Sequence, residues 1–116
     1  MKKVALIVAG GKGERMNADI PKQFLLLNNL PILMHTIKQF SHFEEIVLVL
    51  PKSQFDYWNG LCKNNNFNQI HILVEGGETR FHSVKNGLDK IDNTSVVAIH
   101  DGVRPLISTA LINNLV

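Results

Sequence analysis

The sequence contains a single cysteine, Cys62, so it has neither an internal disulfide nor a metal site built from several cysteines. Because disulfides are typical of oxidising compartments, this scarcity favours a reducing, intracellular location. An excess of one charge is also missing, since 12 Lys and Arg against 10 Asp and Glu leave a net charge of +2. So small an excess gives no reason to expect a nucleic-acid or membrane-surface partner.

Long hydrophobic runs are absent as well. No apolar stretch approaches the ~18 residues of a membrane-spanning helix. Lys2-Lys3 and the apolar run after it imitate a signal peptide, but the run ends after six residues in Gly-Gly-Lys-Gly. With 45% hydrophobic and 19% charged residues, the 116 residues fit one folded domain. We therefore predict a soluble, cytoplasmic protein.

Short apolar runs rich in Val and Ile recur along the chain and predict four buried strands. They cover residues 4–9, 46–50, 70–74 and 96–100. Helical patterns follow these runs. They begin at Pro31, cover 52–63, and begin again at Thr79 and near Ser108.

The third helical pattern is the most regular. Thr79 is a favourable N-cap, and Val84, Leu88 and Ile91 follow at the spacing of one apolar helix face. Strands that alternate with helices are typical of parallel sheets covered on both faces. The sequence thus predicts an α/β fold, a Rossmann-like three-layer α/β/α sandwich with a mostly parallel sheet.

Open α/β sheets bind ligands beyond the carboxyl ends of their strands. The segments that follow the predicted strand ends are 10–15, 51–52, 75–80 and 101–104. The first, third and fourth each combine Gly with Arg and an acidic residue, whereas the second contains only Pro and Lys. We expect those three loops to meet along one edge and form a single site.

The first of these loops is the most informative. Gly10, Gly11 and Gly13 follow a buried strand, and Arg15 and Lys22 come soon after. Glycines let backbone N–H groups approach phosphates, and nearby cations can neutralise a polyphosphate. The pattern predicts a nucleotide site with chemistry at phosphorus. The alternatives are a tight turn for the glycines and ordinary surface positions for the two cations.

Two familiar glycine-rich motifs fit poorly. A dinucleotide fingerprint would place its third glycine at Met16, and the acidic residue that binds ribose is missing from Leu50-Pro51-Lys52. A P-loop requires Gly-Lys-Ser/Thr, which Lys12-Gly13-Glu14 does not supply. Neither a His-Glu-x-x-His metal motif nor a Gly-x-Ser-x-Gly elbow occurs.

Four motifs remain and occur in a sensible order along the chain. They are A-G-G-x-G-x-R-M from Ala9, P-K-Q-F from Pro21, G-G-E-T-R-x-x-S-V over 76–84 and H-D-G-V-R-P over 100–105. With them the chain resembles the cytidylyltransferases that make CDP-methylerythritol in isoprenoid synthesis. The resemblance implies a nucleotide-diphospho-sugar transferase fold and a reaction of CTP with 2-C-methyl-D-erythritol 4-phosphate. Because members of that family are longer, residues 1–116 would be the nucleotide-binding part of one cytidylyltransferase domain, truncated at its C-terminus.

The resemblance also implies roles for individual residues. Arg15 and Lys22 would be catalytic and stabilise the transition state. The nucleotide would be bound by Ala9, Gly10, Gly11, Gly13, Gly76, Gly77, Glu78, Arg80 and Ser83. Asp101 and Arg104 would bind the second substrate, and Asp101 would hold Mg²⁺, which prefers oxygen ligands. The alternatives are a helix-dipole role for Glu78, a turn-forming role for Asp101 and a salt bridge between Asp101 and Arg104.

Partners follow from the same resemblance. They are CTP, a polyol phosphate and a second subunit of a homodimer in the full-length protein, with no nucleic acid and no membrane. Ribitol 5-phosphate cytidylyltransferases are similar in the first and last motifs, although the run over 83–88 favours the methylerythritol branch. A third hypothesis is a catalytically inactive fragment that binds CTP without turnover.

Overall fold

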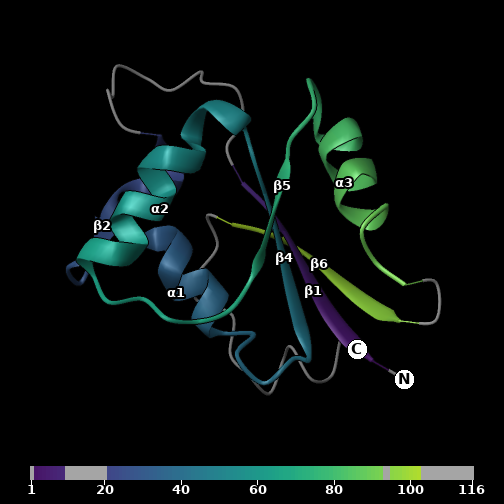
Figure 1. Cartoon of the computed structure of the whole chain (residues 1–116), viewed down its shortest axis with the longest axis horizontal. Coiled ribbons are helices and arrows are strands. Elements are labelled where there is room, and N and C mark those ends of the chain that lie inside the picture. Colours follow the sequence, from purple (N-terminus) through teal and green to yellow (C-terminus); the bar gives the residue numbers. More distant parts are fainter. Residues whose placement is uncertain (1, 10–20, 93–94, 103–116) are drawn as a thin grey trace.

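Four parallel strands form the sheet at the centre of the structure (Figure 1). They are β1 (Lys3–Val8), β4 (Glu45–Leu50), β5 (Ile72–Glu75) and β6 (Val96–Asp101), in the order β5-β4-β1-β6. The computed structural model describes residues 2–9, 21–92 and 95–102. The predicted parallel α/β sheet is confirmed, while the helix predicted from Ser108 lies outside the described residues.

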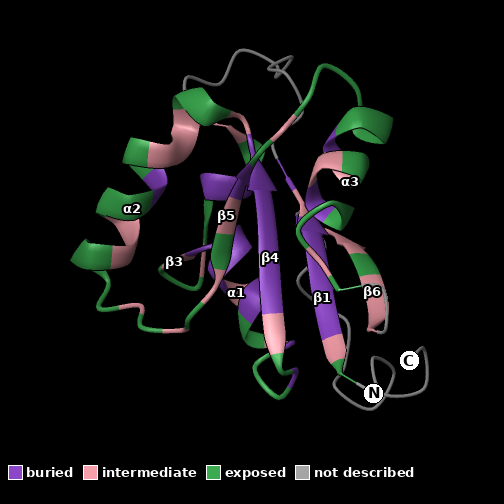
Figure 2. Ribbon diagram, turned by 45° about the vertical axis from the view of Figure 1, so that its right-hand side comes forward, coloured by how far each residue is buried: buried purple, intermediate pink, exposed green. Residues whose placement is uncertain are grey.

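Helices cover the sheet on both faces. Figure 1 shows α1 (Ile32–Lys38) and α2 (Phe55–Asn64) on one side of the strands and α3 (Arg80–Leu88) on the other. Two separate hydrophobic clusters result. Ala5 and Ile7 of β1 join the cluster under α1 and α2, whereas Val4 and Leu6 join the cluster under α3. This alternation follows from the opposite directions of successive side chains in a strand, and Figure 2 shows β1 and β4 buried along most of their length.

The predicted helix starts largely agree with the structure. Pro31 is the N-cap of α1, where its fixed φ and missing N–H are tolerated. The predicted helix over 52–63 is a 3₁₀ turn, η2 (Lys52–Gln54), that continues into α2. Thr79 caps α3, because its side-chain oxygen accepts a hydrogen bond from the His82 N–H.

Three expectations from apolar periodicity are wrong. The run over 96–100 forms β6 but is not a buried strand, since none of its residues is buried and Ile99 is 46% exposed. Leu88 is 40% exposed, whereas Ser83 and Gly87 of the same helix are buried against the sheet. The helix is turned so that its small residues face β1 and β4, which allows a closer approach than Leu88 would. Ile70, predicted to begin the third strand, is 84% exposed, and β5 begins two residues later at Ile72.

A short hairpin was not predicted. Strands β2 (Leu26–Leu27) and β3 (Leu30–Pro31) pair antiparallel across a two-residue turn. Asn28 and Asn29 in that turn have φ values of 54° and 70°, the positive values that a type I′ turn requires. Strands of two residues are too short to show an alternating pattern, so only the Asn-Asn pair could have signalled the turn.

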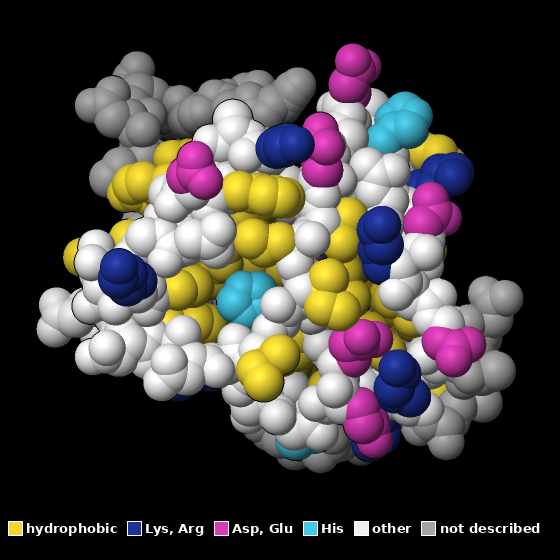
Figure 3. All heavy atoms as spheres, viewed as in Figure 1, with side chains coloured by type: hydrophobic (Ala, Val, Ile, Leu, Met, Phe, Trp, Pro, Cys, Tyr) yellow, Lys and Arg dark blue, Asp and Glu magenta, His cyan; other side chains and the backbone are white. Residues whose placement is uncertain are grey.

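The surface has mixed charge. On the face seen in Figure 3, Lys and Arg side chains are interspersed with Asp and Glu, so this face has no continuous field of one sign. Among the described residues, no helix combines the length and apolar character needed to cross a membrane.

Gly87 sets the distance between α3 and the sheet. A Cβ added there would lie 2.4 Å from Leu6 Cδ1 and 2.9 Å from Val49 Cγ2, whereas one added at Gly60 in α2 would meet nothing within 4 Å. We expect Gly87→Ala to lower the free energy of unfolding by about 1–2 kcal/mol, because overpacking outweighs the gain in helix propensity. Gly60→Ala is the matched control and should raise it by up to ~1 kcal/mol. Urea denaturation of both variants measures the difference, and equal effects would contradict this packing.

The Cys62 thiol lies on α2, partly buried against the larger hydrophobic cluster. Burial raises its pKa to about 11, because the thiolate loses hydration there. We expect iodoacetamide to alkylate native Cys62 at pH 8 at least ~10-fold more slowly than the unfolded chain, since only the thiolate reacts. Mass spectrometry in buffer and in denaturant follows the reaction. Equal rates would show that the thiol is not protected.

Candidate functional site

The four strands have their carboxyl ends at the same edge of the sheet. Three backbone hydrogen bonds continue the pairing past the strands: Ala9 N to Val49 O at 3.0 Å, Gly102 N to Val8 O at 2.9 Å, and Gly76 N to Leu50 O at 2.8 Å. The segments that begin at residues 9, 76 and 102 therefore leave the same edge of the sheet. Residues far apart in sequence are brought together there, as the strand pattern predicts.

The strand order reverses at β1. From β1 the chain adds β4 and then β5 on one side, after which β6 pairs on the other side of β1. Ligands in open α/β sheets bind where the order reverses in this way. Val8 of β1 is the register partner of Asp101 in β6, so Ala9 and Asp101 lie on the two sides of the reversal point.

The Gly76-Gly77 turn is fastened to the start of α3. The Gly77 N–H donates to Ser83 Oγ at 3.0 Å, and Asn86 Nδ2 donates to the Glu75 carbonyl at 3.0 Å. A Cβ at Gly77 would lie 2.4 Å from the Cβ of His82, so a side chain does not fit there. The turn is thereby held against the carboxyl end of β5.

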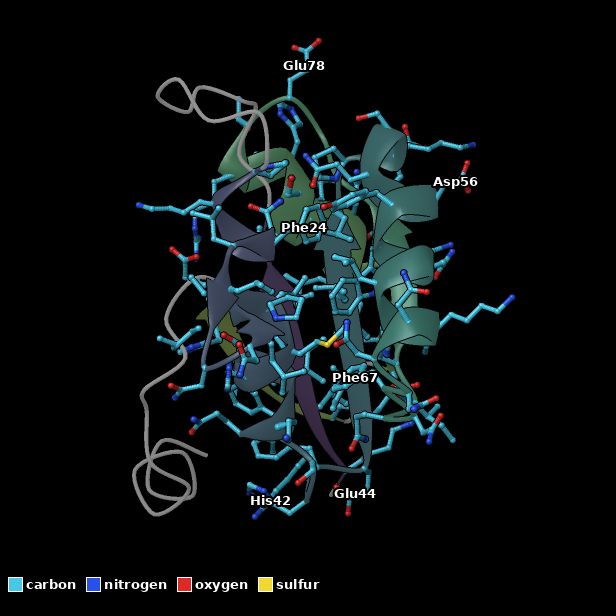
Figure 4. The ribbon with its side chains drawn as sticks, turned by 90° about the vertical axis from the view of Figure 1, so that its left-hand side faces the viewer. Phe24, His42, Glu44, Asp56, Phe67 and Glu78 are labelled. Atoms are coloured by element: carbon cyan, nitrogen blue, oxygen red, sulfur yellow. The ribbon has the colours of Figure 1, made fainter. Side chains whose placement is uncertain are left out.

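The predicted nucleotide contacts on this turn differ in accessibility. Glu78 and Arg80 are exposed, and Figure 4 shows Glu78 projecting from the end of the molecule opposite His42 and Glu44. Ser83 is only 9% exposed, and its oxygen is engaged by Gly77. Ser83 can still donate its hydroxyl proton to a ligand. Its clearest role in the structure is to shape the turn.

Lys22 lies on a short 3₁₀ turn, η1 (Lys22–Phe24), that is anchored by its other two residues. Gln23 is buried, and its Nε2 donates to Gln54 Oε1 at 2.7 Å. Phe24 is buried too, with its ring 6.0 Å from that of Trp58. Gln54 ends η2, which follows the carboxyl end of β4, so the Lys22 turn is tied to the same edge. Lys22 itself is exposed.

Several predicted site residues lie outside the described residues. They are Gly10, Gly11, Gly13, Arg15 and Arg104. The predicted pairing of Arg15 with Lys22 therefore stays a prediction. Of the predicted site, the described part comprises Ala9, Lys22, the Gly76-Gly77 turn with the start of α3, and Asp101.

Asp101 is the predicted metal ligand and is partly buried at the end of β6. Within the described residues, no three His, Cys, Asp or Glu side chains gather into a metal site. Magnesium is usually held by one or two carboxylates together with substrate phosphates. Asp101 by itself therefore fits Mg²⁺ only in company with a bound nucleotide.

Two hydrogen bonds at this edge could not be predicted. One joins Gln23 to Gln54, and the other runs from Thr36 Oγ1 in α1 to the Gly102 carbonyl at 2.9 Å. The available signals were the polar Gln23 inside P-K-Q-F and a threonine among apolar residues of α1. Neither signal reveals its partner, which lies 31 and 66 residues away respectively.

Glu44, a carboxylate with a lowered pKa, lies at the amino edge of the sheet, opposite the candidate site. The Lys3 N–H donates to Glu44 Oε1 at 2.7 Å, and this hydrogen bond to the charged form lowers the pKa of Glu44. Figure 4 shows Glu44 and His42 at the end of the molecule away from Glu78. The shift belongs to the amino edge of the sheet and has no part in the candidate site.

Taken together, the reversal point, the Gly-Gly turn and the anchored lysine define an α/β protein with a parallel sheet whose loops meet at its carboxyl edge, the edge at which proteins of this class bind ligands. The chain belongs to the family of IspD, 2-C-methyl-D-erythritol 4-phosphate cytidylyltransferase, whose model matches residues 3–116. This confirms the family that the four sequence motifs indicate.

Individual relatives agree with the family match. The 2-C-methyl-D-erythritol 4-phosphate cytidylyltransferases of Porphyromonas gingivalis and Bacteroides fragilis are 55% and 52% identical, each over 97% of this chain. They are matched over 51% and 52% of their own lengths, so the chain spans about half of these relatives. The crystal structure of 4-diphosphocytidyl-2C-methyl-D-erythritol synthase from Anaerococcus prevotii matches 98% of this chain and 51% of its own, with a TM-score of 0.76 and 29% identity.

The role of Ser83 in the turn can be tested with two serines. Ser83→Ala removes the acceptor of the Gly77 N–H and should lower the free energy of unfolding by about 1 kcal/mol. Ser95 is the control, because in the described part of the chain its buried Oγ has no hydrogen-bond partner. Ser95→Ala should therefore be neutral or slightly stabilising. Urea denaturation compares the two, and a neutral Ser83→Ala would contradict the turn-forming role.

Proposed function

We propose that the protein is a cytidylyltransferase that converts CTP and 2-C-methyl-D-erythritol 4-phosphate into 4-diphosphocytidyl-2-C-methyl-D-erythritol and pyrophosphate. The observation that carries the proposal is the family match over residues 3–116, with relatives of that name about half identical along 97% of the chain. The meeting of the Gly76-Gly77 turn, Lys22 and Asp101 at one sheet edge supports it.

The reaction is an in-line displacement at phosphorus. A phosphate oxygen of the erythritol phosphate attacks the α-phosphorus of CTP, and the bond from that phosphorus to the bridging oxygen breaks. The electron pair leaves with pyrophosphate. Because the attacking phosphate is already ionised, no general base is required. Catalysis then depends on positioning and on positive charge at the oxygens that gain negative charge.

We assign Lys22 and Arg15 as the residues that supply this positive charge. An ammonium on a flexible stem is a mobile point charge, and in Lys22 the stem is exposed while the backbone is anchored. Arg15 would supply a guanidinium fork able to bridge two phosphate oxygens.

The nucleotide is assigned to the loops that leave β1 and β5. The N–H groups of Ala9, Gly76 and Gly77 donate within the fold, so these residues would meet the nucleotide by close approach of their backbone. The N–H groups of the glycine loop after Ala9 are the ones that we assign to phosphate oxygens. Glu78, Arg80 and Ser83 would complete the nucleotide contacts, and Asp101 and Arg104 would contact the second substrate.

Magnesium is part of the proposal. When bound, it would supply positive charge that offsets the negative charge of the phosphates. Asp101 is the residue that would hold it.

We further propose that the full-length protein is a cytoplasmic homodimer. The single cysteine supports the reducing location, and the homodimer is what the resemblance in the sequence implies.

Replacement of the assigned lysine tests the proposal most directly. We expect Lys22→Ala in the full-length protein to lower kcat by about 10²–10³-fold, because a positioned charge is lost from the transition state. Pyrophosphate release from CTP and 2-C-methyl-D-erythritol 4-phosphate is the measurement. Lys63→Ala is the matched control, because Lys63 is exposed near the end of α2, about 12 Å along that helix from its first residue.

Unchanged turnover in Lys22→Ala would overturn the assignment of that lysine. A wild-type protein that used ribitol 5-phosphate in place of the erythritol phosphate would overturn the substrate. Calorimetry with CTP alone, followed by product detection, separates a binding fragment from an enzyme, since a fragment would bind CTP without releasing pyrophosphate.

A further inference from the structure

Thr36 is a polar residue in an apolar setting. It lies in the middle of α1, between Leu33 and Ile37 of the larger hydrophobic cluster, and its exposed fraction is 0%. Its hydroxyl has two nearby acceptors: the Gly102 carbonyl at 2.9 Å and the Ile32 carbonyl of its own helix at 3.4 Å. The shorter distance makes Gly102 the better acceptor. A side chain of α1 thus holds the backbone that follows β6.

Gly102 is fixed from three directions. Its N–H donates to the Val8 carbonyl at 2.9 Å, and its carbonyl accepts from Thr36. A Cβ on Gly102 would lie 2.7 Å from the Cβ of Ala9 and 3.0 Å from Leu33 Cδ1, so its third side is closed by packing. Together these contacts lock the end of β6 to the end of β1 and to α1.

The locked residues are those that the candidate site uses. Ala9 and Asp101 lie on the two sides of the reversal point, and Gly102 directly follows Asp101. We propose that Thr36 is a positioning residue: through the Gly102 carbonyl its hydroxyl fixes Asp101 relative to the end of β1. This role rests on the proposed cytidylyltransferase function, because it concerns how Asp101 meets the second substrate.

Loss of the hydroxyl would move the turn. Without Thr36 Oγ1, the Gly102 carbonyl loses its buried donor, and buried carbonyls rarely stay unpaired. The backbone after Asp101 would shift to find another partner, and displacements of about 1 Å near reacting groups can cost up to ~10²-fold in rate.

The experiment compares Thr36→Val with Thr36→Ser in the full-length protein. Valine keeps the shape and removes the donor, whereas serine keeps the donor. We expect Thr36→Val to lower kcat/KM for 2-C-methyl-D-erythritol 4-phosphate by about tenfold or more, while Thr36→Ser stays within about threefold of the wild type. The Kd for CTP, measured by calorimetry without Mg²⁺ so that Asp101 does not contribute, should change by less than about threefold in both, since the glycine turns assigned to the nucleotide stay in place.

A stability control separates positioning from folding. Ile37→Val is the matched variant, because Ile37 is the next residue of α1, equally buried in the same cluster and without a polar group. It should lower the melting temperature and leave kcat/KM within about twofold of wild type, whereas Thr36→Val lowers both.

Each outcome decides the proposal. Unchanged kcat/KM in a folded Thr36→Val, or an equal loss in Ile37→Val, would overturn it. If Thr36→Val does not fold, Thr36→Ala takes its place, because alanine removes the donor without adding a methyl group near the Gly102 carbonyl. If neither variant folds, the hydrogen bond from Thr36 to Gly102 serves stability alone and the proposal is overturned. A wild-type protein that makes no product would instead refute the proposed function.

Discussion

The parallel pairing of β1 between β4 and β6 is the constraint on which the rest of the structure depends. In this register Val8 lies opposite both Val49 and Asp101, so three strands end together and release their loops at one edge. The register is held because β1 is apolar on both faces and a slip of one residue would exchange the two hydrophobic clusters. A site assembled from distant loops is possible only because this pairing is fixed.

The carboxyl edge combines two devices, each with its own physical role. Glycines at positions 77 and 102 provide room where a Cβ would clash with a neighbouring element. Polar side chains from a second element then hold the turns. Ser83 accepts from the Gly77 N–H and Thr36 donates to the Gly102 carbonyl, whereas Gln54 accepts from the Gln23 side chain. Glycines without these hydrogen bonds would leave the turns mobile, so a preorganised edge needs the glycines and the hydrogen bonds together.

The setting of Lys22 suits an electrostatic role in transfer at phosphorus. The side chain of Lys22 is exposed, whereas Gln23 and Phe24 are buried and Gln23 is hydrogen-bonded to Gln54. The ammonium group can therefore move while the backbone of Lys22 stays in place. Backbone order of this kind lowers the entropy lost when substrates align. Family membership is the basis for proposing nucleotidyl transfer, and the anchored position of Lys22 at the carboxyl edge is the structural feature that would assist it.

The sequence by itself determined the local features. The four apolar runs, the start of α1 at Pro31 and the cap at Thr79 follow from local periodicity and capping, and the four motifs indicate the family. Only the tertiary structure decided which way α3 turns, so that Gly87 and not Leu88 meets the sheet. It also decided that Gln23 meets Gln54 and that Thr36 meets Gly102. Those contacts join residues 31 and 66 positions apart, and local patterns contain no information about a partner that only folding brings near.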